Sequence, residues 1–280
     1  MKPVVSVVMP TRGRVSFVRR AILSVIDQSF PEFELLILDN TPSKEKEAVR
    51  QLATLDSRII FVNRGEVGLT EARHLGAVLA KGKLLALLDS DDYWAKRRLE
   101  RHVETWNHNG IGLSWDRWAE ANEKEFKVFP QPFKGGLIPP PNVAVKLYGW
   151  NFIHASSGIV STHFARTQGF PLRDIMSSDW ALFMKAAERQ TSYFLTETLS
   201  FKDIHAPERV TDVMTQEVEA EISSIRNWFL MNRPRIYGTL YAKRKLSSFV
   251  RKARWGRRIV DVLERTRKYR PGPSPMNRSH

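Results

Sequence analysis

The 280-residue sequence contains no cysteine, so disulfide bonds are excluded and a reducing compartment is compatible with it. It also lacks any run of about 20 apolar residues, the length that a membrane-spanning helix needs. Its first residues lead directly into an apolar, strand-like run, without the charged and then apolar pattern of a secretory signal. We therefore expect a cytoplasmic protein, able to reach a membrane only as a peripheral protein on its inner face.

Two common phosphate-binding patterns are absent as well. A dinucleotide-dependent oxidoreductase needs the fingerprint G-x-G-x-x-G after a strand, and the sequence has none. A nucleotidyltransferase would carry a glycine-rich loop with a lysine after its first strand, but residues 10–14 (Pro-Thr-Arg-Gly-Arg) contain one glycine and no lysine. The first class is excluded, and a nucleotidyltransferase of similar fold stays an alternative.

The acidic cluster that follows residues 84–88 is the most informative feature that is present. These five apolar residues predict a buried strand, and Asp89, Asp91 and Asp92 come directly after it. Like charges at this density repel each other, so a fold tolerates them best with a cation among them. Oxygen ligands of this kind suit Mg²⁺ or Mn²⁺. The alternative is that Asp91 or Asp92 merely caps a helix over 93–108.

Strand-like and helix-like segments alternate along the first hundred residues. Apolar runs predict strands at 4–9, 33–38, 58–62 and 84–88, and amphipathic stretches predict helices at 17–28, 43–55 and 68–81. This alternation indicates an α/β fold with a mainly parallel sheet and right-handed crossovers. Three of the four strands end in polar or charged clusters, which should meet at one edge of the sheet and form a nucleotide site.

Five blocks of the sequence resemble, in order, the signature blocks of glycosyltransferase family 2; they are residues 6–14, 23–28, 33–40, 71–76 and 88–92. The resemblance is dense over residues 4–109, thin from 110 to 210 and absent after 215. It implies the GT-A fold, which is Rossmann-like with a mainly parallel sheet flanked by helices. It also implies a nucleotide-sugar-binding half (1–109) and an acceptor-binding half (110–215). The change of composition near 215 predicts a third region, a basic helical extension (216–280), whose last ten or so residues we expect to be disordered.

The same resemblance implies a metal-dependent enzyme that moves a sugar from a UDP- or dTDP-sugar to a hydroxyl acceptor, with inversion, in cell-surface glycan synthesis. Asp89-Ser90-Asp91 matches the DXD motif of the family, which implies that Asp91 binds Mn²⁺ or Mg²⁺ together with His205. Asp179 is implied as the catalytic base, with Asp174 as the alternative. The implied donor-binding residues are Pro10, Thr11, Arg12, Asp39, Asn40, Arg73, Asp89 and Ser90.

Several alternatives stay open. Asp179 could simply cap the helix predicted over 180–190. Asn40 stands where the family usually has an aspartate that accepts the uracil N–H; because an amide oxygen can also accept it, both uracil and thymine remain. Some retaining enzymes share this fold and motif, so inversion is an expectation. A non-catalytic relative that binds sugar-nucleotides is the further alternative.

The net charge of +14 resides in the C-terminal region. Residues 226–280 contain 16 lysines and arginines but only two acids, Asp261 and Glu264, whereas residues 1–225 contain 28 of each sign. Apolar residues at helical spacing separate these cations, a pattern typical of basic amphipathic helices on anionic membranes. We therefore expect residues 226–270 to bind an anionic membrane surface, near a glycan or lipid-linked acceptor. Packing of the apolar stripe on the rest of the chain is the alternative, and no nucleic-acid partner is expected.

Overall fold

The computed structural model describes residues 2–63, 65, 67–107, 110–121, 125–171, 175, 177–203, 216–242 and 245. The chain divides into two compact units, Met1–Asn227 and Trp228–His280. In the second unit, the described residues 234–242 are helical, and the ring of Phe229 packs edge-on against Tyr237 with centroids 5.5 Å apart. Most of the basic region predicted to bind membranes lies outside the described residues. Among the described helices, none combines the length and the apolar character needed to span a bilayer.

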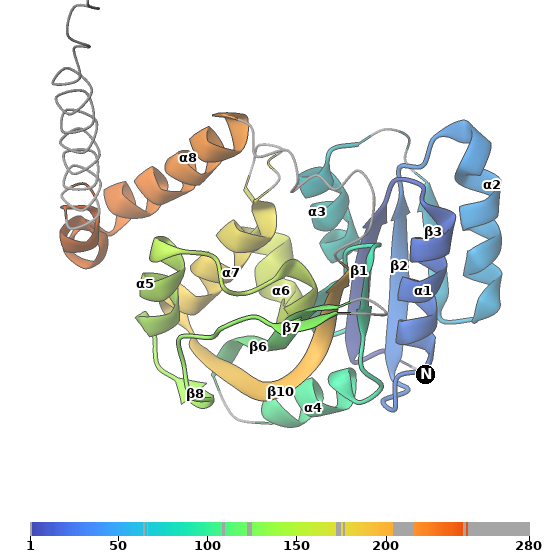
Figure 1. The fold of residues 1–280 in the computed structure, drawn as a ribbon, viewed down its shortest axis with the longest axis horizontal. Coiled ribbons are helices and arrows are strands. Elements are labelled where there is room, and N and C mark those ends of the chain that lie inside the picture. The colour runs from blue at the N-terminus through green and yellow to red at the C-terminus, as the bar shows by residue number, and fades with distance from the viewer. Residues whose placement is uncertain are drawn as a thin grey trace, which may run out of the picture. The chain divides into compact units, whose positions relative to one another are not determined.

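A ten-stranded sheet forms the centre of the first unit, with the main strand order β3-β2-β1-β4-β9-β6-β10-β5 (Figure 1). The first four of these strands are parallel, as the sequence predicts. Their bounds are β1 Val5–Thr11, β2 Phe33–Asp39, β3 Ile59–Asn63 and β4 Leu84–Leu87. The predicted α/β fold with a parallel sheet and flanking helices is therefore confirmed.

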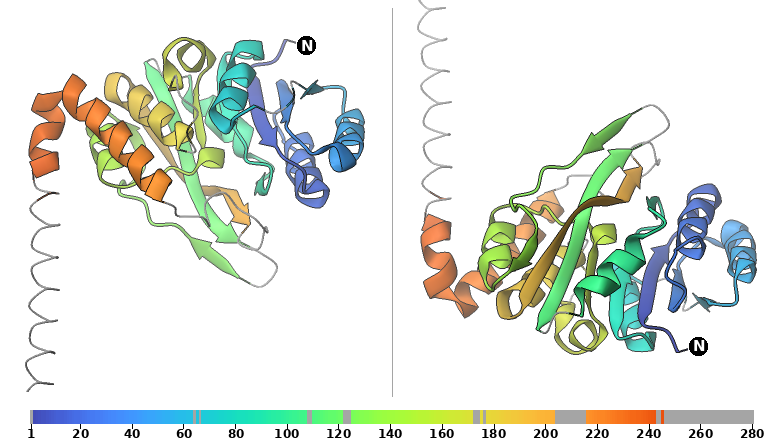
Figure 2. Two further views of the ribbon diagram at one scale, coloured as in Figure 1. Left: turned by 90° about the horizontal axis from the view of Figure 1, so that it is seen from above. Right: turned by 90° about the horizontal axis from the view of Figure 1, so that it is seen from below.

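Helices cover both faces of this parallel half (Figure 2). Alternate residues of β1 point to opposite faces of the sheet. Val5 and Val7 therefore pack in one core cluster with the apolar face of α1, and this cluster also includes Val49 of α2. Val8 faces the other way, toward α3. These helices are α1 Val15–Ile26, α2 Ser43–Leu52, which continues into the 3₁₀ turn η1 Ala53–Leu55, and α3 Leu69–Leu79.

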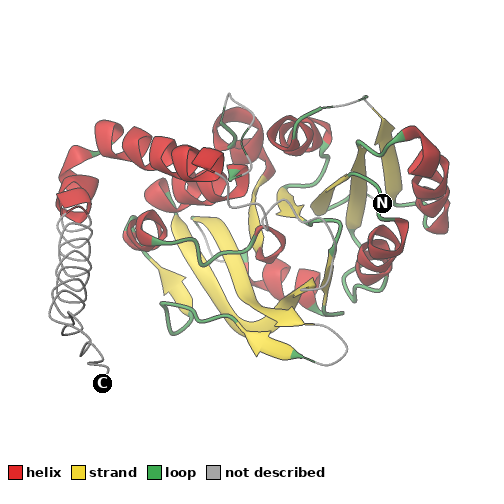
Figure 3. Cartoon of the chain, turned by 45° about the horizontal axis from the view of Figure 1, so that its top comes forward, coloured by secondary structure: helices red, strands yellow, loops and turns green. Residues whose placement is uncertain are grey.

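The second half of the sheet is built from two long parallel strands, β6 Ile111–Ala121 and β10 Thr191–Asp203 (Figure 3). Strand β9 Gly158–Ser161 lies between β4 and β6 and is antiparallel to both, which joins the two halves. The remaining elements of this half are β7 Phe126–Val128, β8 Gly136–Ile138, α4 Arg98–Thr105, α5 Asn142–Gly149, η2 Ala155–Ser157, α6 Thr162–Phe164, η3 Ala165–Gly169 and α7 Ser178–Arg189. Helix α8, Gln216–Asn232, crosses the boundary between the two units.

The helix predicted over 93–108 is wrong in its first part. Asp92–Trp94 form a short strand, β5, which pairs antiparallel with the end of β10, and helix α4 begins only at Arg98. The residue that caps α4 is Arg97, so neither Asp91 nor Asp92 caps it. The difference from the prediction is caused by tertiary strand pairing, because β10 supplies backbone partners for residues 92–94 from about a hundred residues further along the chain.

A fully buried polar network connects α4 with β6 and β10. Arg98 donates from Nε to Asp116 Oδ2 at 2.8 Å, and His102 Nε2 lies 3.0 Å from the same oxygen. Because a carboxylate can only accept, Nε2 of the neutral imidazole carries the proton, and Nδ1 accepts from the Ser114 hydroxyl at 2.8 Å. Burial, together with the charge of Arg98, lowers the pKa of His102 to about 4.

This network makes the protein sensitive to acid. His102 binds a proton at about pH 6.5 in the unfolded chain but only near pH 4 in the folded protein, so the unfolded state holds more protons between these values. We expect the free energy of unfolding to decrease as the pH falls from 6.5 to 4, by up to roughly 3 kcal/mol from this residue. In urea denaturation at pH 7 and pH 4.5, His102→Gln should show a smaller decrease than the wild type, and the exposed control His163→Gln should not. Equal pH dependence in all three proteins would contradict this assignment.

Candidate active site

Polar residues at the ends of β1, β2 and β4 meet at one edge of the sheet, as the strand pattern predicts. Thr11 and Asp39 are neighbours at the ends of β1 and β2, and the amide of Asn40 donates to the Thr11 carbonyl at 2.8 Å. The amide of Gly13 donates to the Thr41 hydroxyl at 2.9 Å. This edge therefore carries a tightly bonded turn directly beside the acidic cluster.

Two buried oxygen acceptors are presented by neighbouring residues of this edge. Asn40 donates from Nδ2 to the Val67 carbonyl at 2.7 Å, which fixes the orientation of its amide. Among the described residues, its Oδ1 atom has no hydrogen-bond partner, and neither does Oδ2 of Asp39. Since a buried acceptor is costly to leave unpaired, a ligand bound here should supply N–H or O–H donors.

Arg73 of α3 connects parts of the site that are far apart in the sequence. Its guanidinium donates to Asp89 Oδ1 at 2.9 Å, and from Nη1 to Asp179 Oδ1 at 3.3 Å and the Ser178 hydroxyl at 2.9 Å. The side chain is almost wholly buried. Helix α3 can deliver it because Gly76 lies directly on β1, where an added Cβ would be 2.3 Å from the Val8 side chain.

The two carboxylates held by Arg73 differ in their proton affinity. For Asp89, burial raises the pKa, but the charges of Arg73 and His154 outweigh it and the net pKa is lowered. For Asp179, burial is the largest influence and Arg73 offsets only part of it, so the pKa is raised. Asp89 is thus held as an anion, and Asp179 is the better proton acceptor of the two. Asp179 lies in the first turn of α7, whose N-cap residue is Ser177.

The rest of the acidic cluster is held by residues that the sequence analysis did not select. Asp92 Oδ2 accepts from the Ser156 hydroxyl and lies next to His154 Nε2, both at 2.5 Å. Ser156 also accepts from the amide of Asp89 at 3.0 Å, so one hydroxyl joins the two ends of the cluster. Burial alone would lower the pKa of His154, but Asp92 and Asp89 raise it above its ordinary value.

A divalent cation fits this chemistry. Ligand atoms of Asp89, Asp92 and His154 lie within 4.8 Å of one another, the only such group among the described residues. Burial and the neighbouring Asp92 and Asp89 raise the pKa of Asp91, and Arg14 offsets them only in part. Oxygen atoms with one imidazole suit Mn²⁺ or Mg²⁺. The cluster therefore favours an additional positive charge.

The other predicted site residues are placed as follows. Thr11 and Ser90 are buried, Pro10 is half-buried and Arg12 is exposed at the turn after β1. His205 and Asp174 lie outside the described residues. No described residue tests the predicted metal contact of His205, and the roles assigned to all these residues stay predictions.

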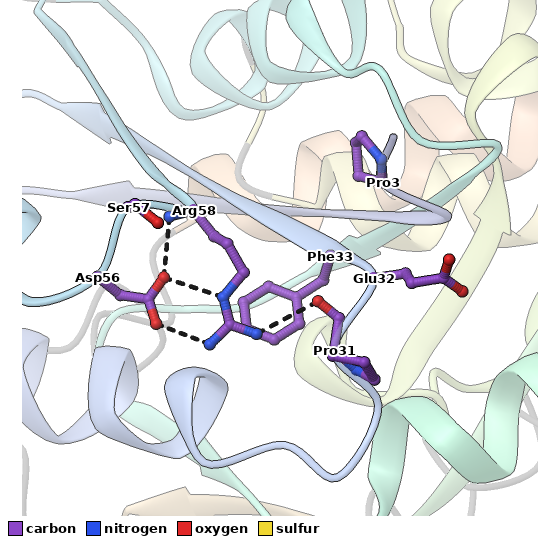
Figure 4. Close-up of a pocket in the computed structure, with 7 residues that line it drawn as sticks. All are labelled: Pro3, Pro31, Glu32, Phe33, Asp56, Ser57 and Arg58. Atoms are coloured by element: carbon purple, nitrogen blue, oxygen red, sulfur yellow. Dashed lines mark hydrogen bonds and ion pairs between the residues drawn. The ribbon is translucent and has the colours of Figure 1, made fainter. Parts of the chain in front are cut away.

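A cavity of about 400 Å³ elsewhere on the first unit does not belong to this site (Figure 4). It lies at the starts of β2 and β3, at the opposite edge of the parallel sheet. Its guanidinium, Arg58, is bonded to Asp56 and to the Pro31 carbonyl, and it lies over the ring of Phe33 at 3.9 Å. The cation is thus already paired within the fold.

The sequence profile described as "Glycosyl transferase family 2" matches residues 6–172, more than half of the chain. The chain belongs to glycosyltransferase family 2. The resemblance found in the five sequence blocks is thereby confirmed.

Relatives within the family include the putative teichuronic acid biosynthesis glycosyltransferase TuaG of Bacillus subtilis, 35% identical over 120 residues, which are 42% of this chain and 48% of TuaG. The UDP-Glc:alpha-D-GlcNAc-diphosphoundecaprenol beta-1,3-glucosyltransferase WfgD of Escherichia coli is 30% identical over 119 residues, 42% of this chain and 47% of WfgD. The chain thus spans about half the length of these two curated relatives.

Solved structures show the same fold. S. aureus TarS 1–349 in complex with UDP-GlcNAc has a TM-score of 0.64 and 19% identity, over 80% of this chain and 66% of the TarS 1–349 chain. The mannosyltransferase PcManGT from Pyrobaculum calidifontis, in complex with GDP-Man and Mn²⁺, has a TM-score of 0.54 and 15% identity, over 86% and 76% of the two chains. These likenesses establish the GT-A fold of this family 2 member.

Removal of the Ser156 hydroxyl should destabilise the acidic cluster. In Ser156→Ala, the Asp92 carboxylate and the Asp89 amide each lose a buried partner, so we expect the free energy of unfolding to fall by about 2–3 kcal/mol. Ser157→Ala is the matched control, because Ser157 is equally buried but its hydroxyl bonds only the His154 carbonyl among the contacts described here. That variant should lose about 1 kcal/mol in the same urea titration. Equal losses in the two variants would contradict a special role for Ser156.

Proposed function

We propose that this chain transfers a sugar from a nucleoside diphosphate donor to an acceptor hydroxyl. The observation that carries the proposal is the contact of one buried guanidinium, Arg73, with both Asp89 and Asp179. It joins the acidic motif at the end of β4 to a carboxylate with a raised pKa. A glycosyl transfer needs such a pair, one group near the leaving diphosphate and one near the attacking hydroxyl. Family membership and the UDP-GlcNAc complex of the structural relative TarS support this reading.

For the donor, we favour a uridine or thymidine diphosphate sugar. Asn40 presents its Oδ1 atom because Nδ2 is held by Val67, so the site offers an acceptor to an N–H of the base. The N3–H group of uracil or thymine fits it, whereas cytosine presents a ring acceptor at that position. Pro10, Thr11, Arg12, Asp39 and Ser90 surround the same edge.

A bound Mn²⁺ or Mg²⁺ ion would act as a Lewis acid that neutralises the charge on the departing diphosphate. We infer that Asp91 would hold it, with His205 as the second protein ligand. Asp89, Asp92 and His154 form a further group of donor atoms in the same acidic cluster as Asp91. Arg73, in the second turn of α3, adds its own positive charge beside Asp89. The density of carboxylates at this edge supports a site for such a cation.

Asp179 would act as the base. The acceptor oxygen forms a bond to the anomeric carbon, the bond from that carbon to the diphosphate oxygen breaks, and the hydroxyl proton passes to Asp179. The raised pKa of Asp179 suits proton acceptance better than that of a fully exposed aspartate. Attack by the acceptor in a single step inverts the anomeric centre.

The acceptor is proposed to be a glycan or a lipid-linked saccharide of cell-surface synthesis. The printed name of WfgD gives a diphosphoundecaprenol-linked acceptor for that relative. Residues 226–280 carry 16 basic residues against two acids, and this charge would hold the enzyme at an anionic cytoplasmic membrane face. The proposal therefore places the reaction beside the membrane.

The central test separates donor binding from transfer. In a thermal-shift panel with Mn²⁺, UDP and dTDP should raise the melting temperature of the wild type, and CDP and ADP should not. Asp179→Asn should keep this shift while kcat falls by 10²-fold or more, the usual scale of general base catalysis. Asp91→Asn should lose the Mn²⁺-dependent part of the shift.

The control for this panel is Asp27→Asn, a carboxylate that is exposed on the surface. It should behave as the wild type in both measurements. Wild-type turnover in Asp179→Asn would move the base to Asp174, and a product that retains the anomeric configuration by NMR would refute the single displacement. If GDP alone raised the melting temperature, the unpaired oxygen acceptors of Asn40 and Asp39 would be assigned to a purine base.

Membrane association has its own test. Full-length protein should sediment with vesicles that contain phosphatidylglycerol, and the bound fraction should fall steeply between 50 and 300 mM salt as the surface charges are screened, on a scale of about 10 Å at 100 mM. Replacement of Arg251, Lys252, Arg254, Arg257 and Arg258 by glutamine should abolish sedimentation and leave the UDP shift unchanged. A failure of the wild type to sediment even at low salt would instead favour packing of the apolar stripe on protein.

A further inference from the structure

Arg20 of α1 contacts the acidic motif and the end of β10 at the same time. Its Nη2 atom donates to the backbone carbonyl of Asp91 at 2.8 Å, and its Nη1 atom lies 2.5 Å from Asp203 Oδ2. The guanidinium also lies over the ring of Tyr93 at 4.7 Å and over that of Phe17 at 5.3 Å. A single side chain from the first helix therefore connects the motif after β4 with the end of β10.

These contacts lie where the pairing of β5 with β10 ends. The last residue pair of this antiparallel ladder joins Asp92 with Lys202. The same register brings the next two residues, Asp91 and Asp203, opposite each other. Like charges in opposite positions of two strands repel each other and destabilise the pair. Arg20 bonds both residues, so it holds together two chain segments whose own charges would separate them.

The atom of Asp91 that Arg20 binds is the backbone carbonyl oxygen, not a carboxylate oxygen. Burial, together with the charges of Asp92 and Asp89, raises the pKa of the Asp91 carboxyl, and Arg14 offsets this only in part. The charged form of Asp91 is thus repelled by its neighbours, which favours a rotation of the main chain that turns the carboxylate away from them. A hydrogen bond to the carbonyl of the same residue opposes that rotation without occupying the carboxylate.

We propose that Arg20 is a positioning residue, which fixes the main chain of Asp91 and thereby the direction of the Asp91 carboxylate toward a bound cation. The inference rests on the proposed function, in which Asp91 holds that cation. An arginine suits this task because the two Nη atoms of one planar group bind two separate partners. A lysine has one ammonium nitrogen, which can pair with Asp203 but cannot keep the geometry of both contacts.

The experiment measures the affinity of the full-length protein for Mn²⁺ by electron paramagnetic resonance, at saturating UDP, in the wild type, Arg20→Ala and Arg20→Lys. Arg20→Ala should bind Mn²⁺ about tenfold or more weakly than the wild type, the usual scale for residues that orient a metal ligand. Arg20→Lys should lose about threefold or more, because it restores the charge without the second contact.

Chemical rescue separates positioning from a merely structural role. The Arg20 side chain is 38% exposed, so a small solute can reach the space that its removal leaves. Guanidinium chloride at about 10 mM should restore most of the Mn²⁺ affinity of Arg20→Ala, and sodium chloride at the same concentration should not. A structural role would lower the free energy of unfolding in urea but leave the Mn²⁺ affinity of the folded protein unchanged. Where Arg20→Ala does not fold, Arg20→Lys decides the question.

Two controls make the result specific. Arg19→Ala removes the same charge from an exposed position on α1 and should leave the Mn²⁺ affinity unchanged. In the Asp91→Asn background, Arg20→Ala should have no further effect on Mn²⁺ binding, since the carboxylate that Arg20 positions is already absent. Wild-type affinity in Arg20→Lys, or a loss in Arg20→Ala that guanidinium does not restore, would overturn the inference while leaving the proposed function intact. Absence of any Mn²⁺ or UDP binding by the wild type would refute the proposed function, and the inference with it.

Discussion

The structure depends on one electrostatic constraint, the gathering of three carboxylates at the carboxyl end of β4. Buried like charges are tolerated only when each is neutralised, and here every one has a separate partner from a different element. Helix α3 supplies Arg73 to Asp89, the turn before α1 supplies Arg14 to Asp91, and the segment before β9 supplies His154 to Asp92. These elements are placed around the edge of the sheet so that each contributes one positive charge to the acidic cluster.

Hydrogen bonds connect the acidic cluster with the interior of the sheet. Ser156 bonds the acidic cluster through its hydroxyl, and its carbonyl accepts from the Trp94 indole and lies 3.0 Å from the Ser200 hydroxyl. Ser200 in turn bonds the buried pair of Arg98 and Asp116. A continuous polar path therefore runs from the site edge into the core between β6, β9 and β10. Both halves of the sheet contribute to it, so neither half alone can fix the geometry of the site.

Local sequence patterns were enough to predict the parallel half of the sheet, because its strands are apolar runs and its helices are amphipathic. They were also enough to select the acidic motif, whereas Arg73 was selected through the family resemblance of residues 71–76. They failed over 93–108, where strand pairing with β10 overrides the local preference. His154 and Ser156 were missed because they lie more than sixty residues from Asp92 and belong to no recognisable motif. The contact of Arg73 with Asp179, 106 residues apart, likewise needs the tertiary fold.

The pairing of β5 with the end of β10 has a consequence for synthesis of the chain. Asp92 leaves the ribosome 62 residues before His154, and its backbone partners near Ser200 follow about a hundred residues after it. At a synthesis rate of roughly 5–20 residues per second, several seconds to tens of seconds pass before the partners of the acidic motif have been synthesised. During that interval β1 to β4 have all been synthesised, but their charged edge lacks these partners and is open to water and to dissolved cations. The acidic motif is therefore among the last parts of the first unit to acquire its native surroundings.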